Sequence, residues 1–122
     1  MSEDQERRAL PRTTVSGQLF ARLHDGRTVR LLDLSGAGAQ IEHLDLLRPA
    51  ASCHLELPPP LGALSLPARV VWCTVIGRKR MPGGEVRLVA RSGLRFTTFT
   101  AKQQAGLADT LRTLATVLQP IA

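Results

Sequence analysis

The sequence predicts a mainly β protein: a six-stranded antiparallel β-barrel followed by one C-terminal α-helix. Short runs rich in β-forming residues follow one another between residues 15 and 96, with turn-forming residues between them. After residue 100 the apolar pattern changes to a helical period. Six short strands with open edges would invite aggregation, so we expect them to close into a barrel or near-barrel.

The expected strands are separated by recognisable turn sequences. Asp25-Gly26 lies between the first two runs and is a strong hairpin signal. The proline run 58–60 predicts an extended polyproline connector at the surface. The strands are expected at residues 15–23, 29–34, 37–43, 52–57, 64–76 and 86–96.

The C-terminal segment carries a leucine stripe typical of a helix that packs on one face. Its members lie at i, i+4, i+7 and i+11, namely Leu107, Leu111, Leu114 and Leu118. Thr100 and Gln103 form a plausible capping box at the helix start. We therefore expect one domain with three parts: a flexible basic arm over residues 1–14, the barrel over 15–99 and the helix over 100–119.

Composition limits the classes of protein to consider. The chain has 122 residues, of which 43% are hydrophobic, enough for one buried core. No run approaches the roughly 20 apolar residues of a membrane span, and the start "MSEDQERR" lacks the apolar core of a secretory signal. We expect a cytoplasmic protein in which Cys53 and Cys73 are two buried thiols.

The glycine turn in "LLDLSGAGAQIE" does not fit an enzyme. The dinucleotide pattern needs a third glycine where Ile41 stands, and it needs a helix where a strand is expected. Ser35 lacks the flanking glycines of a nucleophile elbow. The histidines and cysteines show no metal-ligand spacing. We therefore expect no catalytic residue, no metal site and no cofactor.

The N-terminal arm is basic. Arg7, Arg8 and Arg12 lie within six residues of a chain whose formal net charge is +6. Arginine forms planar, bidentate contacts with phosphates and guanine edges. Taken alone, such an arm is typical of a solvated tail, and only its combination with the glycine turn indicates a ligand.

Together, Arg8-x-x-x-Arg12 and the later Asp33-x-Ser35-x-x-Gly38 resemble the two-part motif of PilZ domains. The resemblance covers nearly the whole chain, and "SGLRF" at residues 92–96 is similar to the closing strand of these domains. It implies a six-stranded barrel with a trailing helix that binds cyclic di-GMP. Members with an arginine directly before the first motif arginine often bind two ligand molecules, so Arg7 implies a pair.

The chemistry of these residue types agrees with that ligand. An arginine fork can pair with guanine O6 and N7 or grip a phosphate. Asp33 can accept from guanine N–H groups or hold an arginine, and Ser35 can donate to a phosphate or a base. Gly38 leaves room for a flat base or supplies an unusual backbone conformation. Trp72 is a possible further contact, although a core indole fits the sequence equally well.

Binding is expected to order the arm over the barrel and so to signal to an unidentified protein partner. One alternative is a ligand-independent adaptor of the same fold. Another is a small-barrel nucleic-acid-binding module, which the charge favours. With one tryptophan, three phenylalanines and no tyrosine, few rings are available for base stacking, so the sequence favours the receptor.

Overall fold

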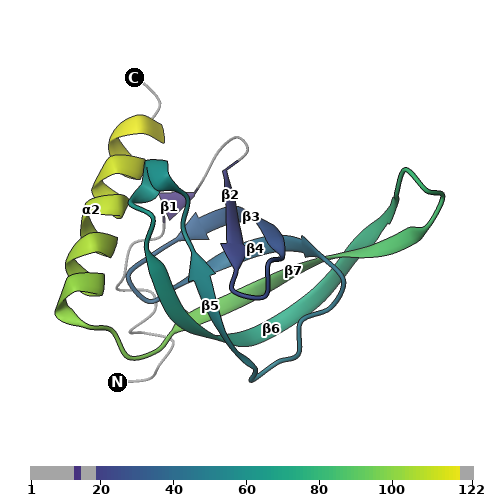
Figure 1. Cartoon of the computed structure of the whole chain (residues 1–122), viewed down its shortest axis with the longest axis horizontal. Coiled ribbons are helices and arrows are strands. Elements are labelled where there is room, and N and C mark those ends of the chain that lie inside the picture. The colour runs from purple at the N-terminus through teal and green to yellow at the C-terminus, as the bar shows by residue number, and fades with distance from the viewer. Residues whose placement is uncertain (1–12, 15–18, 119–122) are drawn as a thin grey trace.

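The structure is a computed structural model that describes residues 13–14 and 19–118. Six antiparallel strands form a closed ring, and one helix lies against it (Figure 1). The strands of the ring are β2 (Phe20–Leu23), β3 (Thr28–Leu34), β4 (Gly38–Leu44), β5 (Ser52–Glu56), β6 (Ser65–Arg80) and β7 (Val86–Phe96). The expected fold, a mainly β domain with a C-terminal helix, is confirmed.

Strand pairing follows the ring in the order β3, β2, β5, β6, β7 and β4, and β4 returns to β3. The hairpins β3–β4 and β6–β7 join neighbours in sequence, whereas Gly38 of β4 pairs with Arg95 of β7. A two-residue strand, β1 (Thr13–Thr14), adds to β3 opposite Asp33 and Leu34. Thr13 and Thr14 belong to the segment expected as an arm, and the rest of that arm lies outside the described residues.

Leucine, valine and isoleucine side chains fill the ring because they occupy alternate positions on each strand. The most deeply buried are Leu23, Val29, Leu31, Leu34, Ile41, Leu55, Leu66 and Val70. Cys53 is buried as expected, but Cys73 is only half-buried, because it lies where β6 leaves the ring. Both thiols are free.

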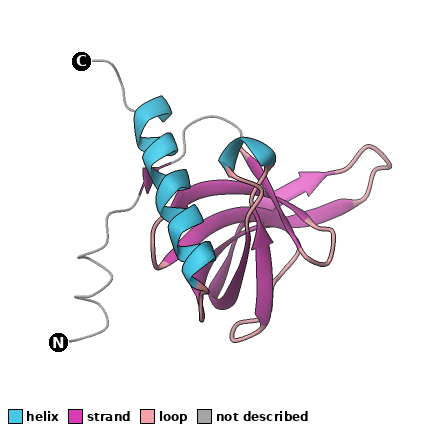
Figure 2. Cartoon of the chain, turned by 60° about the vertical axis from the view of Figure 1, so that its left-hand side comes forward, coloured by secondary structure: helices cyan, strands magenta, loops and turns pink. Residues whose placement is uncertain are grey.

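The helix α2 (Ala101–Leu118) packs across one side of the barrel (Figure 2). The capping box is confirmed, since the amide of Gln103 donates to Thr100 Oγ1 at 3.1 Å and Gln103 Oε1 accepts from the Thr100 amide at 2.9 Å. Leu107 and Leu114 lie in the core, with Leu111 packed against it. The side chain of Leu118 is outside the described part. No helix among the described residues has the length and apolarity to cross a bilayer.

The proline run differs from its prediction. Pro58 is extended, but residues Pro59–Leu61 form a short 3-10 helix. A turn here brings Leu61 into the core, and the prolines at its start have no amide hydrogens to leave unpaired. Thr110 of α2 donates from its hydroxyl to the Leu61 carbonyl at 2.7 Å, which satisfies a buried acceptor and ties the helix to the barrel.

Candidate functional site

Ser35 organises the turn between β3 and β4. Its hydroxyl oxygen accepts from the amides of Ala37 at 3.1 Å and Gly38 at 3.2 Å. The hydroxyl also lies 3.3 Å from the Gly38 carbonyl, to which it donates, and the Ser35 amide donates to that carbonyl at 2.9 Å. With Ser35 only 4% exposed, its polar atoms are used inside the turn. The side chain therefore fixes the shape of this loop.

Asp33 is held at a bulge two residues before the turn. The register of β3 against β4 shifts between Leu31 and Asp33, so Asp33 lies opposite Gln40. Asp33 Oδ1 accepts from the Gln40 amide at 3.0 Å. A bulge re-aims the side chains beside it, and here the carboxylate substitutes for a ladder acceptor. Asp33 is half-buried, and its bond to the Gln40 amide fixes the position of its carboxylate.

Gly38 is required by a close approach of two strands. A Cβ atom at this position would stand under 3.0 Å from the carbonyl oxygen of Leu94, 3.1 Å from its carbonyl carbon and 3.3 Å from Arg95 Cα. Its neighbour Gly36, in the same turn, would meet nothing within 4 Å. Gly38 therefore permits the β4–β7 contact, and its role does not depend on a left-handed backbone conformation.

One row of side chains runs from Asp33 across four strands of the outer surface. Asp33 pairs with Gln40, Gln40 with Gly93, and Gly93 with Trp72. Directly opposed residues in antiparallel strands lie on the same face. The pyrrole side of the indole covers Gly93, since a Cβ there would come within 3.0 Å of three Trp72 ring atoms. Trp72 is half-buried and lies on this outer face, not in the core.

The next row toward the turn is basic. Gly38 pairs with Arg95, and Arg95 pairs with Arg69 of β6. This register places two guanidinium-bearing side chains directly opposite each other on neighbouring strands, an arrangement that suits contact with one anion. Both arginines are exposed. Arg69 and Arg95 were not among the site residues predicted from the sequence. Their alternation with Ala68 and Leu94, which are buried, is the signal that places them on the outer face.

The row on the other side of Trp72 contains two arginines and one glutamate. Glu42 on β4 accepts from Arg30 on β3 at 3.1 Å and from Arg91 on β7 at 3.3 Å. Arg30 and Arg91 therefore share one carboxylate, which offsets part of their charge.

A second polar cluster lies inside the barrel. His43 Nε2 lies 2.7 Å from Ser92 Oγ, and His43 Nδ1 lies 2.9 Å from the Asp45 carbonyl oxygen. Burial lowers the pKa of His43 below its usual value, which favours the neutral ring. Ser92 is fully buried, so no substrate reaches this pair. Among the described residues no cluster of metal-ligating side chains is found.

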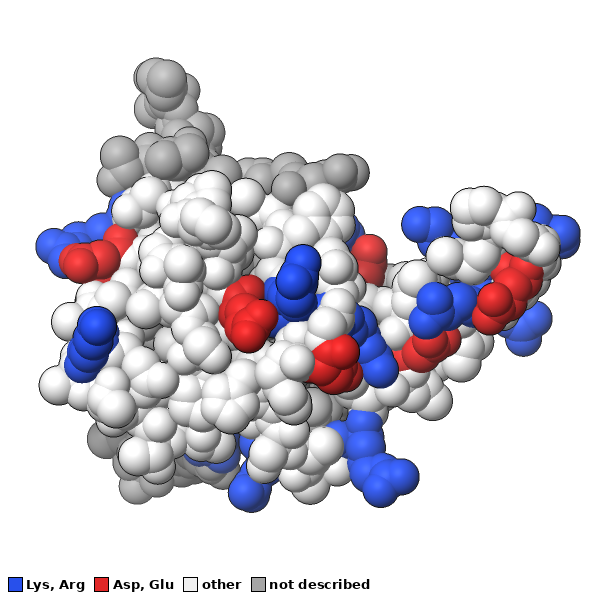
Figure 3. All heavy atoms as spheres, in the orientation of Figure 1, with Lys and Arg blue, Asp and Glu red and all other residues white. Residues whose placement is uncertain are grey.

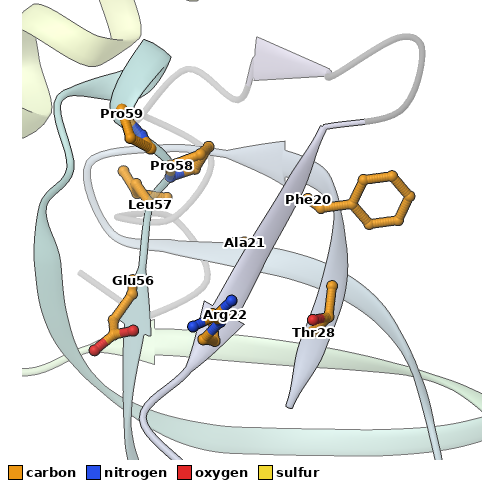
Figure 4. A pocket seen from close by; sticks show the side chains of 8 residues that line it. All are labelled: Phe20, Ala21, Arg22, Thr28, Glu56, Leu57, Pro58 and Pro59. Atoms are coloured by element: carbon orange, nitrogen blue, oxygen red, sulfur yellow. The ribbon is translucent and has the colours of Figure 1, made fainter. Parts of the chain in front are cut away.

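One surface hollow lies away from the turn. It is an open hollow of about 340 Å³ beside β2, β3 and β5, and none of the predicted site residues lines it (Figure 4). Phe20, Pro58 and Pro59 give it an apolar wall, and Arg22 lies opposite Glu56 across the β2–β5 pair. The charged residues of this hollow are thus one cation and one anion on neighbouring strands.

The structure brings Asp33, Gly38 and Trp72 onto one outer surface, with Ser35 beneath its rim. This surface, which we call the turn face, comprises Asp33, Gln40, Gly93, Trp72, Gly38, Arg95 and Arg69. Arg7, Arg8 and Arg12 lie outside the described residues. Thr14 of β1 pairs with Asp33, so the chain emerges from the arm beside this face.

The closed ring, the covering helix and the polar turn face define a small β-barrel domain of the PilZ type. A model of the PilZ domain matches residues 6–112, and the chain belongs to that family. A search of curated protein sequences finds no significant match.

Solved structures give the same fold. The PilZ domain of YcgR from Escherichia coli, solved with c-di-GMP, is 17% identical with a TM-score of 0.68, and the match covers 92% of this chain and 94% of that domain. The K. pneumonia MrkH–c-di-GMP complex is 17% identical with a TM-score of 0.63, over 89% of this chain and 52% of that one. The Bacillus subtilis inhibitor of motility MotI/DgrA is 19% identical with a TM-score of 0.53, over 93% and 53%.

Proposed function

We propose that the protein is a cyclic di-GMP receptor that binds the nucleotide on the turn face and has no catalytic role. The observation that carries the proposal is the direct opposition of Arg69 and Arg95, one row away from Trp72 and Asp33. It places positive charge beside an indole and a carboxylate. These are the three groups that a guanine nucleotide with two phosphate charges can use together.

Each residue of the turn face has a distinct role in this proposal. Arg69 and Arg95 receive a phosphate, and Trp72 offers a ring against which a guanine packs. Asp33 accepts from guanine N–H groups. Ser35 is a positioning residue, because its hydroxyl is engaged by Ala37 and Gly38.

The arm supplies the opposite side of the site. Arg8 and Arg12 lie in sequence just before β1, whose Thr14 pairs with Asp33, so a short arm can reach the ligand. We propose that these arginines close over the nucleotide and that Arg7 allows a second molecule to stack on the first. The arm then forms a new surface for a protein partner. Hydrogen exchange of the arm amides, with and without nucleotide, tests this ordering.

Proteins with the same fold support this proposal. The YcgR domain and MrkH were solved as c-di-GMP complexes, and this chain has the fold of both. The family's two motifs, Arg8-x-x-x-Arg12 and Asp33-x-Ser35-x-x-Gly38, are complete in the sequence.

Isothermal titration with cyclic di-GMP tests the proposal. We expect saturable binding by the wild type, a stoichiometry near two, and loss of measurable binding in Arg8→Ala. Arg69→Ala should weaken binding about 10- to 100-fold, the effect of one lost hydrogen bond to a charged group of about 1.5–3 kcal/mol. Arg22→Ala is the matched control, because it removes the same charge from β2, on the opposite side of the ring.

Three results would refute the receptor. If the wild type releases no heat and does not compete with labelled nucleotide, the ligand-independent adaptor is favoured. If Arg22→Ala weakens binding as much as Arg69→Ala, the attraction is by net charge alone. If duplex or single-stranded nucleic acid binds independently of Arg8 and Asp33, the nucleic-acid module is favoured.

A further inference from the structure

The hairpin formed by the outer halves of β6 and β7 projects from the barrel (Figure 1). Among the described strands, β5 pairs with β6 only as far as Arg69, and β4 pairs with β7 only from Val89 onward. Beyond those points the two strands pair with each other alone, ending with Arg80 opposite Val86. From the sequence, the first of these strands was expected to end at residue 76.

The hairpin is well ordered in its hydrogen bonding. Its tip is closed by the Met81 amide donating to the Glu85 carbonyl at 2.7 Å and by the Gly84 amide donating to the Met81 carbonyl at 2.9 Å. At its root, Arg87 forms an ion pair with Asp45, which holds the pKa of that carboxyl below its usual value. These contacts define the turn at the tip and tie the hairpin to the residue that follows β4.

One face of the hairpin continues the inward face of the barrel into solvent. Val86 and Leu88 alternate with buried Ala90 and so lie on the same side of β7. Val75 lies opposite Ala90 on β6 and shares that side. Val75 is 45% exposed and Val86 is 51% exposed, because the barrel has ended where they stand. These side chains form an apolar strip in which Val75 and Val86 are exposed and Leu88 is half-buried.

Two cations lie on the same face as the strip. Arg78 pairs with Leu88, and Arg80 pairs with Val86. Within the described part of the chain, neither arginine forms an ion pair. The space-filling view shows basic side chains over the projecting hairpin, with acidic side chains between them (Figure 3). We call this combination of Val75, Val86, Leu88, Arg78 and Arg80 the hairpin face.

We propose that the hairpin face docks an acidic, apolar segment of a partner protein. Apolar contacts bury the aliphatic strip, and carboxylates of the partner pair with Arg78 and Arg80. The proposal is separate from nucleotide binding, because the turn face lies at the other end of β7.

Other occupants fit this surface less well. A second copy, face to face, would bring four arginines together at Arg78 and Arg80, which is repulsive. A nucleic acid would place its phosphates against the aliphatic strip. A membrane favours apolar or aromatic residues at an inserting tip, whereas this tip consists of Met81, Pro82, two glycines and Glu85.

Site-specific photo-crosslinking in the native cells tests the proposal. Benzoylphenylalanine replaces Val86 on the hairpin face or, as a control, Lys79 on the other face, where it lies opposite Arg87. We expect the Val86 probe alone to capture a protein segment rich in Asp, Glu and aliphatic residues. A synthetic peptide of that segment should bind the purified full-length protein saturably.

Two charge reversals then separate the hairpin face from general attraction. Arg80→Glu should lower the affinity for the peptide at least tenfold. Lys79→Glu, an equal change of charge at the adjacent residue on the other face, should leave that affinity unchanged. Both variants should keep the melting temperature and the cyclic di-GMP titration of the wild type. Capture of another copy, of nucleic acid, of lipid or of nothing beyond the Lys79 control would overturn the proposal, as would equal losses in the two variants.

Discussion

Replacing Gly38 by alanine should destabilise the barrel, because it forces apart two strands that lie in close contact. The added methyl group would stand under 3.0 Å from the Leu94 carbonyl oxygen and 3.1 Å from its carbon. These neighbours are backbone atoms of β7, so they yield only if β4 and β7 move apart. The strain of such a forced displacement is typically about 1–3 kcal/mol.

An opposing term makes Gly36→Ala the necessary control. Alanine reduces the freedom of the unfolded chain, which stabilises a protein by about 0.4–1 kcal/mol where the folded backbone tolerates it. Gly36 would meet nothing within 4 Å and lacks a positive φ, so Gly36→Ala should be neutral or slightly stabilising. The two variants carry the same substitution in one turn.

Differential scanning calorimetry of the two variants checks the reasoning. In a domain of this size roughly 4 °C of melting temperature corresponds to 1 kcal/mol, so Gly38→Ala should melt roughly 4–12 °C below the wild type. Cyclic di-GMP affinity should also fall, because Arg95 is the strand partner of Gly38. Equal melting temperatures for Gly38→Ala and Gly36→Ala would show that β7 accommodates the methyl group, and would refute the close-approach argument.

Three further outcomes are expected. Trp72 is the only tryptophan in a chain without tyrosine, so its fluorescence should change on addition of cyclic di-GMP in the wild type and in Arg22→Ala; an unchanged spectrum at saturation would remove Trp72 from the site. Thr110→Val should lower the free energy of unfolding in urea by about 1–3 kcal/mol, because it removes the hydroxyl that donates to the Leu61 carbonyl. The exposed control Thr113→Val should lower it much less, and equal losses would contradict the hydrogen bond between helix and barrel. His43 has a lowered pKa in the folded state, so the unfolded chain binds more protons. The free energy of unfolding should therefore be largest above the ordinary pKa of 6.5 and fall as the solution is acidified below it. In urea unfolding between about pH 7.5 and 5, His43→Gln should show a smaller fall.

The sequence predicted the elements whose signals are local. β7 has its expected bounds, β3 and β5 differ by one residue at one end, and β4 is shifted by one residue at both ends. The capping box at Thr100 and Gln103 and the turn at Gly26, which has a φ of 93°, are set by neighbouring residues. Periodicity and turn chemistry suffice in such places because the competing structures are few.

Features set by distant contacts were not predictable in the same way. The 3-10 helix at Pro59–Leu61 depends on burial of Leu61 and on Thr110, which is 49 positions away. The length of β6 depends on β7 as a partner, since the "GRKR" segment alone suggests a loop. The opposition of Arg69 and Arg95 arises from the β6–β7 register, which no local pattern specifies.

The pairing of Gly38 with Arg95 also has a consequence for folding. The β3–β4 and β6–β7 hairpins are local and can form early, whereas the β4–β7 contact joins distant parts of the chain and closes the ring. The turn face spans that junction, since Asp33 and Gln40 lie on one side of it and Gly93 and Trp72 on the other. A ligand seated there would bridge two distant parts of the chain across this long-range contact, and would slow global unfolding as well as shift its equilibrium.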